Sequence, residues 1–335
     1  MKASWLRLLV IFITFPILAF SQHTIKFASI APEGSTWLNV MKEYDQAVST
    51  ATNGKVRFKI YAGGVMGDDK AVLRKIRLGQ LHSAGFTGVG LGEIASEVRI
   101  LDSPFLFRNY AEVDFILDKF YGKFADAFEQ KGYVLLGWAE VGFVYVFSQK
   151  PIRSKADMEG VKMWMWEGDP VADATFKALE IAARPLSVVE VMTALQTGMI
   201  DGFYISPLAA IAMQWFTKAN YMMELPLADA CGAVVLSKEQ FNTLPADFQQ
   251  ILLNEGRTYF KKLMKLSRDD NAKAIETLKQ NGIQLIPAPA ASVQKEFEED
   301  GRKARRALTG TLYSQELLTE VENALGEYRK KAAVK

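Results

Sequence analysis

The sequence predicts an α/β protein of two lobes, with doubly wound sheets and a long helix that braces both lobes. Short strands and amphipathic helices alternate along the chain, as they do in parallel sheets covered by helices. More than 300 residues follow the first twenty-one, and that length favours two lobes over one. A single helical pattern over residues 246–280 is too long to fit within one lobe.

The first twenty-one residues have the pattern of a secretory signal peptide. Lys2 and Arg7 precede an apolar run over residues 8–20, and the small residues Ala19 and Ser21 mark a cleavage site. The run is shorter than the about 20 apolar residues that a membrane span needs. We therefore expect export to the periplasm and a mature chain that begins near Gln22. The alternative is an uncleaved anchor helix.

The first elements of the mature chain alternate between strand and helix. Residues 25–30 form a short apolar strand, and Ser35 is a good N-cap for the amphipathic helix that follows. Residues 55–61 alternate between apolar and basic side chains, as a half-buried strand does. A helix over 68–78, which ends at Gly79, completes the repeat and predicts a parallel sheet.

The same alternation returns in the second half of the chain. Residues 162–166 and 200–204 are predicted strands, and 170–179 and 188–196 are predicted helices. A second doubly wound sheet is therefore expected.

Residues 246–280 contain no Pro and one Gly, and their apolar positions recur at helical spacing. A continuous helix of this length would run roughly 50 Å. It should therefore lie across both lobes, unless Gly256 or the polar stretch 267–271 breaks it.

Composition excludes several classes of function. The chain has 40 basic and 38 acidic residues, and no basic block is interleaved with aromatic residues, so nucleic-acid binding has no support. Cys231 is the single cysteine, so no internal disulfide can form. With two histidines and no phosphate loop, metal cluster or nucleophile elbow, the sequence predicts neither an enzyme nor a bound cofactor.

Residues 191–207, which read VMTALQTGMIDGFYISP, resemble the substrate-binding subunits of tripartite ATP-independent periplasmic (TRAP) transporters, the DctP-type family. Further matches lie in order along nearly the whole mature chain: Gly67-Asp68-Asp69, residues 103–107 (SPFLF), residues 157–162 (DMEGVK), and Ser237-Lys238 with Leu244-Pro245. Each motif is weak alone, but the ordered series is specific.

The resemblance implies a periplasmic binding protein of the type II-like fold, which closes on a small molecule by hinge motion. It predicts one lobe from 22–145 plus 233–272 and another from 146–232 plus 273–335, with connecting strands near 144–148 and 230–234. It also implies a membrane permease with a small and a large subunit, driven by an ion gradient.

The sequence departs from the family at the position that usually sets the ligand class. An Arg on the central strand of the family binds the ligand's carboxylate, and Trp164 stands in its place here. A second, less constant Arg position is Val144. A buried carboxylate without a partner costs several kcal/mol. We therefore predict a neutral, apolar or aromatic ligand, for which an accessory periplasmic protein would be a useful carrier.

Ten residues are predicted to bind this ligand. Tyr204 occupies a family site position, Trp164 and Trp166 share one face of their strand, and Thr87, Glu167 and Ser206 would supply polar contacts. The full predicted set is Ile30, Phe86, Thr87, Val144, Trp164, Trp166, Glu167, Val188, Tyr204 and Ser206.

Alternatives remain at this point. The two Trp side chains would be core residues if another cation, Lys162, Arg153 or Arg184, bound an organic acid instead. A metal held by Glu167 or Asp169 could also bridge to a carboxylate. A ligand sensor that signals through a partner needs the same closing clamp as an uptake protein.

Overall fold

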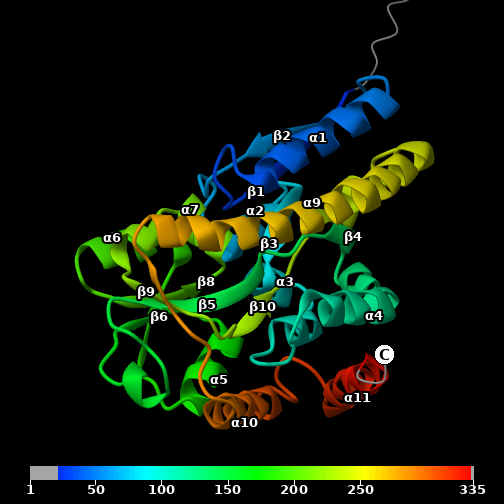
Figure 1. The fold of residues 1–335 in the computed structure, drawn as a ribbon. Helices are drawn as coiled ribbons and strands as arrows, with labels where there is room; N and C mark the ends of the chain where they lie inside the picture. The colour runs from blue at the N-terminus through cyan, green and yellow to red at the C-terminus, as the bar shows by residue number, and fades with distance from the viewer. Residues whose placement is uncertain (1–21, 333–335) are drawn as a thin grey trace, which may run out of the picture.

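The computed structural model describes residues 22–332 and contains two mixed sheets, each covered by helices (Figure 1). The predicted signal peptide lies outside the described residues. Within them, no helix is both long and apolar enough to cross a membrane. The α/β, two-sheet architecture agrees with the predicted fold class.

In the first sheet four strands run in one direction and β11 runs in the opposite direction. β1 runs parallel to β2 and β3, as the repeating strand and helix pattern predicts, whereas β11 runs antiparallel to both of its neighbours, β3 and β4. The order across the sheet is β2 (Val56–Tyr61), β1 (His23–Ser29), β3 (Ser83–Thr87), β11 (Gly232–Ser237) and β4 (Tyr133–Trp138).

Helices on this side of the molecule bury an apolar stripe against the sheet. Ser35 caps the first of them by accepting a hydrogen bond from the Leu38 N–H, as expected. The helices are α1 (Thr36–Ala51), α2 (Asp69–Arg77), α3 (Gly88–Gly92), the 3₁₀ helix η1 (Ser96–Asp102), α4 (Tyr110–Gln130) and α8 (Lys238–Asn242).

The second sheet has the strand order β12 (Gln284–Ile286), β9 (Tyr221–Met223), β5 (Gly142–Ser148), β8 (Gly202–Ile205), β6 (Met163–Trp166) and β7 (Ala183–Leu186), with β10 (Ala228–Ala230) also paired to β5. Its helical segments are η2 (Ala156–Met158), α5 (Pro170–Ala178), η3 (Val188–Glu190), α6 (Val191–Gln196), α7 (Pro207–Ala212) and η4 (Trp215–Lys218).

Helix α9 (Ala246–Gln280) is continuous over its 35 residues, which confirms the predicted long helix. It contacts α1 and β4 beside the first sheet and α7 beside the second, and Figure 1 shows it running along one side of both. The predicted breaks do not occur. Gly256 lets the helix approach the Leu136 carbonyl closely, and Ser267 and Asn271 of the polar stretch are buried.

The chain crosses between the sheets at three places that matter for the site. Residues 139–141 connect β4 to β5, slightly before the predicted segment 144–148. Cys231 separates β10 from β11, within the predicted segment 230–234. On α9, the Asn271 amide donates to the Val141 carbonyl and accepts from the Leu208 N–H, so it joins the first crossing to α7.

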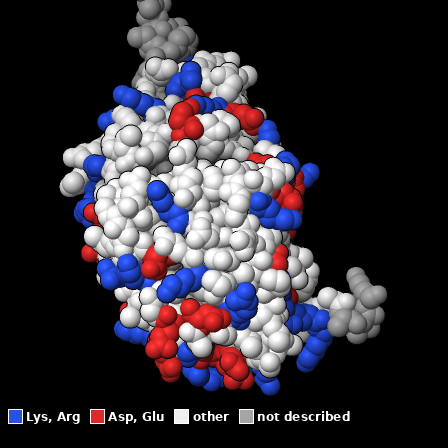
Figure 2. All heavy atoms as spheres, turned by 60° about the vertical axis from the view of Figure 1, so that its left-hand side comes forward, with Lys and Arg blue, Asp and Glu red and all other residues white. Residues whose placement is uncertain are grey.

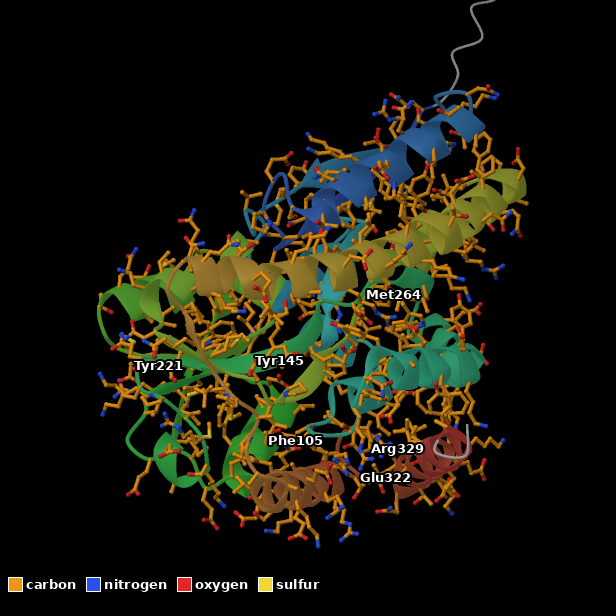
Figure 3. The ribbon with its side chains drawn as sticks, viewed as in Figure 1. Phe105, Tyr145, Tyr221, Met264, Glu322 and Arg329 are labelled. Atoms are coloured by element: carbon orange, nitrogen blue, oxygen red, sulfur yellow. The ribbon has the colours of Figure 1, made fainter. Side chains whose placement is uncertain are left out.

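The last two helices divide between the two sheets. Helix α10 (Ala291–Ala307) packs against α5, whereas α11 (Gln315–Ala332) packs against α4 of the other side. Arg329 pairs with Glu112 on α4, and Figure 3 shows Arg329 between α11 and α4. The predicted lobe boundary assigned 273–335 to one lobe, and α11 lies beside the opposite sheet because of this ion pair and the apolar contacts around it.

Candidate ligand-binding site

A cavity of about 220 Å³ lies where the two sheets face each other. Its wall includes Trp37 of α1 and Phe86 of β3 from the first side, and Trp164, Trp166 and Tyr204 from the second. Apolar and aromatic side chains therefore form most of the surface that a bound molecule would touch. Enclosed sites of this kind, between two lobes, are typical of small-molecule binding.

Nine of the ten predicted residues line this cavity, from segments far apart in the sequence: Ile30, Phe86, Thr87, Val144, Trp164, Trp166, Val188, Tyr204 and Ser206. Glu167 is not among its lining residues and is exposed, in the turn after β6. Glu167 lies outside the cavity because the strand ends at Trp166 and the chain turns away there.

Trp164 is both a wall of the cavity and a core residue. Its ring stacks on Tyr204 with centroids 5.1 Å apart and meets Trp215 edge-on at 5.3 Å. The indole N–H donates to the Leu186 carbonyl at 3.0 Å. That donor is thus already engaged within the protein, so Trp164 offers a ligand apolar ring surface rather than a hydrogen bond.

Three of the predicted hydroxyl groups also make hydrogen bonds within the protein. The Thr87 hydroxyl donates to Asp69 Oδ2 at 2.6 Å, and Ser206 Oγ accepts from the Ala209 N–H as the cap of α7. The Tyr204 hydroxyl accepts from the Trp166 N–H. Burial raises the pKa of the Asp69 carboxyl to about 6.

Among the described residues that line the cavity, Arg99 is the one basic side chain, and the sequence analysis missed it. It is 3% exposed, and its guanidinium binds Asp102 at 2.8 Å and Asp169 at 2.9 Å. The spacing of Arg99 and Asp102, three residues apart before the SPFLF motif, is the one sequence signal that could have indicated this pair. Two carboxylates already neutralise this cation.

The other cations considered from the sequence do not line the cavity. Lys162 Nζ donates to the Gly198 carbonyl, and Arg153 and Arg184 are exposed. Asp169, considered as a metal ligand, caps α5 and pairs with Arg99. Residues 22–332 contain no group of three or more His, Cys, Asp or Glu that could hold a metal ion.

Two polar side chains in the wall have no partner, and neither was predicted. Asp229 of β10 and Ser267 of α9 are each 1% exposed and line the cavity. Within the described part of the chain, Asp229 Oδ1 and Ser267 Oγ have no hydrogen-bond partner. Buried polar atoms are nearly always hydrogen-bonded, so this pair is unusual.

Three polar contacts join the two sides of the molecule near the cavity. The Ser187 hydroxyl donates to Asp68 Oδ2 at 3.1 Å, and Lys70 Nζ donates to the Gly168 carbonyl at 3.0 Å. Together with the buried pair of Arg99 and Asp169, they join the loops of the first side to those of the second.

Comparison with known proteins places this geometry among binding proteins. The family model for bacterial extracellular solute-binding protein, family 7, matches residues 27–307. A solute-binding protein of Verminephrobacter eiseniae is 28% identical over 298 residues, which cover 85% of this chain and 88% of the relative. The 2,3-diketo-L-gulonate-binding periplasmic protein of Escherichia coli is 26% identical over 250 residues, 73% of this chain and 75% of the relative.

A solved structure shows the same fold. The TRAP periplasmic solute-binding protein of Desulfovibrio salexigens, with bound orotic acid, superposes with a TM-score of 0.84 at 22% identity. The match covers 91% of this chain and 99% of that one.

Proposed function

Because the chain belongs to bacterial extracellular solute-binding protein family 7, the solute-binding proteins of TRAP transporters, we propose that it captures a small molecule by hinge closure. It would then deliver this molecule to a permease that has a small and a large subunit and is driven by an ion gradient. The observation that carries the proposal is the cavity between the two sheets, walled from both sides. The family's role is transport rather than catalysis. On the face of the molecule that Figure 2 shows, the basic side chains are spread out rather than gathered into one patch.

The contacts between the two sides support closure about a hinge. A ligand first binds the wall of one lobe, and the second lobe then rotates about the crossings at 139–141 and Cys231. Closure forms the contacts of Ser187 with Asp68 and of Arg99 with Asp169. The permease would then recognise the closed form, which a ligand favours by touching both walls at once.

The proposed ligand is neutral and apolar or aromatic. Aromatic rings from both sides form the wall, and the single lining cation, Arg99, is held by two carboxylates. A carboxylate entering this cavity would lose its hydration and meet no free positive charge. The Escherichia coli and Desulfovibrio salexigens proteins bind acids, so this chain would differ from both in its ligand class.

One observation favours a second candidate, an organic acid. Arg99 lines the cavity, and a ligand carboxylate could take the place of Asp169 as one of its two partners. Exchange of one anion for another would keep the guanidinium paired, but it would free Asp169 inside the closed site. The first candidate requires no such rearrangement.

The proposed location is the periplasm, after cleavage near Gln22. An apolar ligand would make an accessory periplasmic carrier useful for delivery.

The first test is to identify the molecule that the chain retains. We would purify residues 22–335, denature them gently, and analyse what is released by mass spectrometry. A neutral apolar or aromatic compound would support the proposed ligand class. A simple organic acid would contradict that class while leaving the transport role in place, and would direct attention to Arg99.

A further inference from the structure

Asp229 is a buried acidic residue in the wall of the cavity. It is the middle residue of β10, between Ala228 and Ala230, and all three line the cavity. The strand is held by backbone bonds, from the Leu227 N–H to the Val144 carbonyl and from the Val141 N–H to the Ala230 carbonyl. Its side chain is therefore not needed to hold the strand in place.

The neighbouring charges leave no cation for Asp229. Arg99 is shared by Asp102 and Asp169, and on α9 Arg268 binds Glu140 at 2.6 Å and Asp114 at 2.7 Å. Two guanidinium groups thus face four carboxylates before Asp229 is added. The region is acidic, so it repels a ligand anion and attracts a ligand that brings hydrogen-bond donors or positive charge.

We infer that Asp229, assisted by Ser267, is the polar anchor of the site, and that the ligand is a mainly apolar or aromatic molecule that donates an N–H or O–H hydrogen bond to the Asp229 carboxyl group. This inference rests on the proposed function and names the ligand chemistry of the same site. In a neutral ligand the donor is a hydroxyl or amide group. A protonated amine in its place would contradict the neutral ligand class but would leave the Asp229 anchor standing. A donor that reached Asp229 Oδ1 would satisfy a buried oxygen that has no partner among the described residues.

The surroundings of Asp229 agree with this role. Burial, followed by repulsion from Glu140 and Asp102, raises the pKa of the Asp229 carboxyl well above its ordinary value. An unpaired buried carboxyl group destabilises a fold, and such groups cluster at binding sites. The aromatic rings of Trp164 and Trp166 would contact the ligand body beside this anchor.

The test uses four probes that share a phenyl ring and differ in the attached group: 2-phenylethylamine, 2-phenylethanol, ethylbenzene and 3-phenylpropionate. Their binding to residues 22–335 is measured by calorimetry and by tryptophan fluorescence. The variants are Asp229→Ala, Asp229→Asn and Ser267→Ala. Asp173→Asn, which changes an exposed carboxylate paired with Lys177, is the control.

We expect the wild-type chain to bind the amine or the alcohol more tightly than ethylbenzene or 3-phenylpropionate. Asp229→Ala should weaken that binding roughly tenfold or more, because a buried bond to a carboxyl group is lost. Asp229→Asn should keep the alcohol but lose the amine, which separates a neutral donor from a cationic one. Ser267→Ala should have a smaller effect, and Asp173→Asn none.

Three results would overturn the anchor. The first is that the wild-type chain binds ethylbenzene or 3-phenylpropionate more tightly than the amine and the alcohol. The second is that both Asp229 variants bind the probes as the wild-type chain does. The third is that the chain binds none of the probes and releases a carboxylic acid that has no other hydrogen-bond donor. Each variant is first checked for cooperative thermal unfolding, and Ser267→Ala decides the question if Asp229→Ala does not fold. The transport role itself fails only if the chain neither binds nor releases any small molecule.

Discussion

Asp69 shows how a single buried carboxyl group positions one wall of the site. Its Oδ2 accepts hydrogen bonds from the Thr87 N–H, the Thr87 hydroxyl and the Gly90 N–H, so it fixes the turn from β3 into α3. Burial nevertheless dominates and raises its pKa from 3.8 to about 6. The protonated form is therefore favoured more in the folded chain than in the unfolded one.

The folded pKa is the higher one, so the contribution of Asp69 to stability is complete below about pH 4 and is lost as the pH rises toward about 6. The loss should approach roughly 3 kcal/mol. Asp69→Asn keeps an oxygen for the three donors and removes the titration. Urea unfolding of both proteins across this pH range should show their stability difference changing with pH, and a constant difference would contradict the assignment.

Residues that line the cavity could be located from sequence where a motif fixes their place on a strand. They could not be located where tertiary contacts bring other segments to the cavity. The alignment to the family located Trp164, Val144 and Tyr204 because each lies at a defined place on a strand. Arg99, Asp229 and Ser267 reach the cavity from other segments. The spacing of Arg99 and Asp102 is the one local signal among them, and no local pattern marks Asp229 or Ser267. The engagement of Trp164 Nε1 by Leu186 likewise depends on β7, twenty-two residues away.

Among the elements, α9 was predicted to its end residues because an uninterrupted apolar period over 35 residues has few other interpretations. The pairing of the antiparallel strands was harder to predict from the sequence. β11 reads as a short apolar run, and its place between β3 and β4 depends on pairing with residues that are distant in sequence. Periodicity determines that a strand exists, but not which strand it joins.

Alanine substitutions at two helical glycines, one on α9 and one on α11, test how closely α9 packs. A Cβ at Gly256 would lie 2.5 Å from the Leu136 carbonyl oxygen, whereas one at Gly326 of α11 would meet nothing within 4 Å. Gly256→Ala should therefore destabilise the fold by about 1–3 kcal/mol, because backbone must shift. Gly326→Ala should stabilise it by about 0.5–1 kcal/mol through helix propensity. Denaturant midpoints that move in the same direction for both variants would refute the close contact.

For the whole molecule, the proposed hinge mechanism makes the balance between open and closed forms depend on the few contacts between the two sides. Ser187→Ala removes the hydrogen bond to Asp68. Because one such bond contributes about 0.5–1 kcal/mol, the ratio of open to closed molecules should rise roughly two- to fivefold. The control is Ser154→Ala, whose bond to Asp157 stays within one lobe.

The measurement is the distance between spin labels on the two sides, attached at Leu78→Cys and Met199→Cys. Both positions are exposed, whereas the native Cys231 is buried and should not react. The fraction of molecules with the longer distance between the two labels should increase in Ser187→Ala but not in Ser154→Ala. Identical distributions in the two variants would show that the Ser187 contact does not influence closure.

The central place of β11 in the first sheet has a consequence for how the chain acquires its structure. β11 lies between β3 and β4 but is made about a hundred residues after β4, at Gly232–Ser237. Until it arrives, the first four strands of that sheet have a gap and cannot complete their core. Such long-range pairing delays folding until most of the chain has emerged. A chain that is expected to leave the cytoplasm would thus remain unfolded during its passage and acquire both lobes together on the far side.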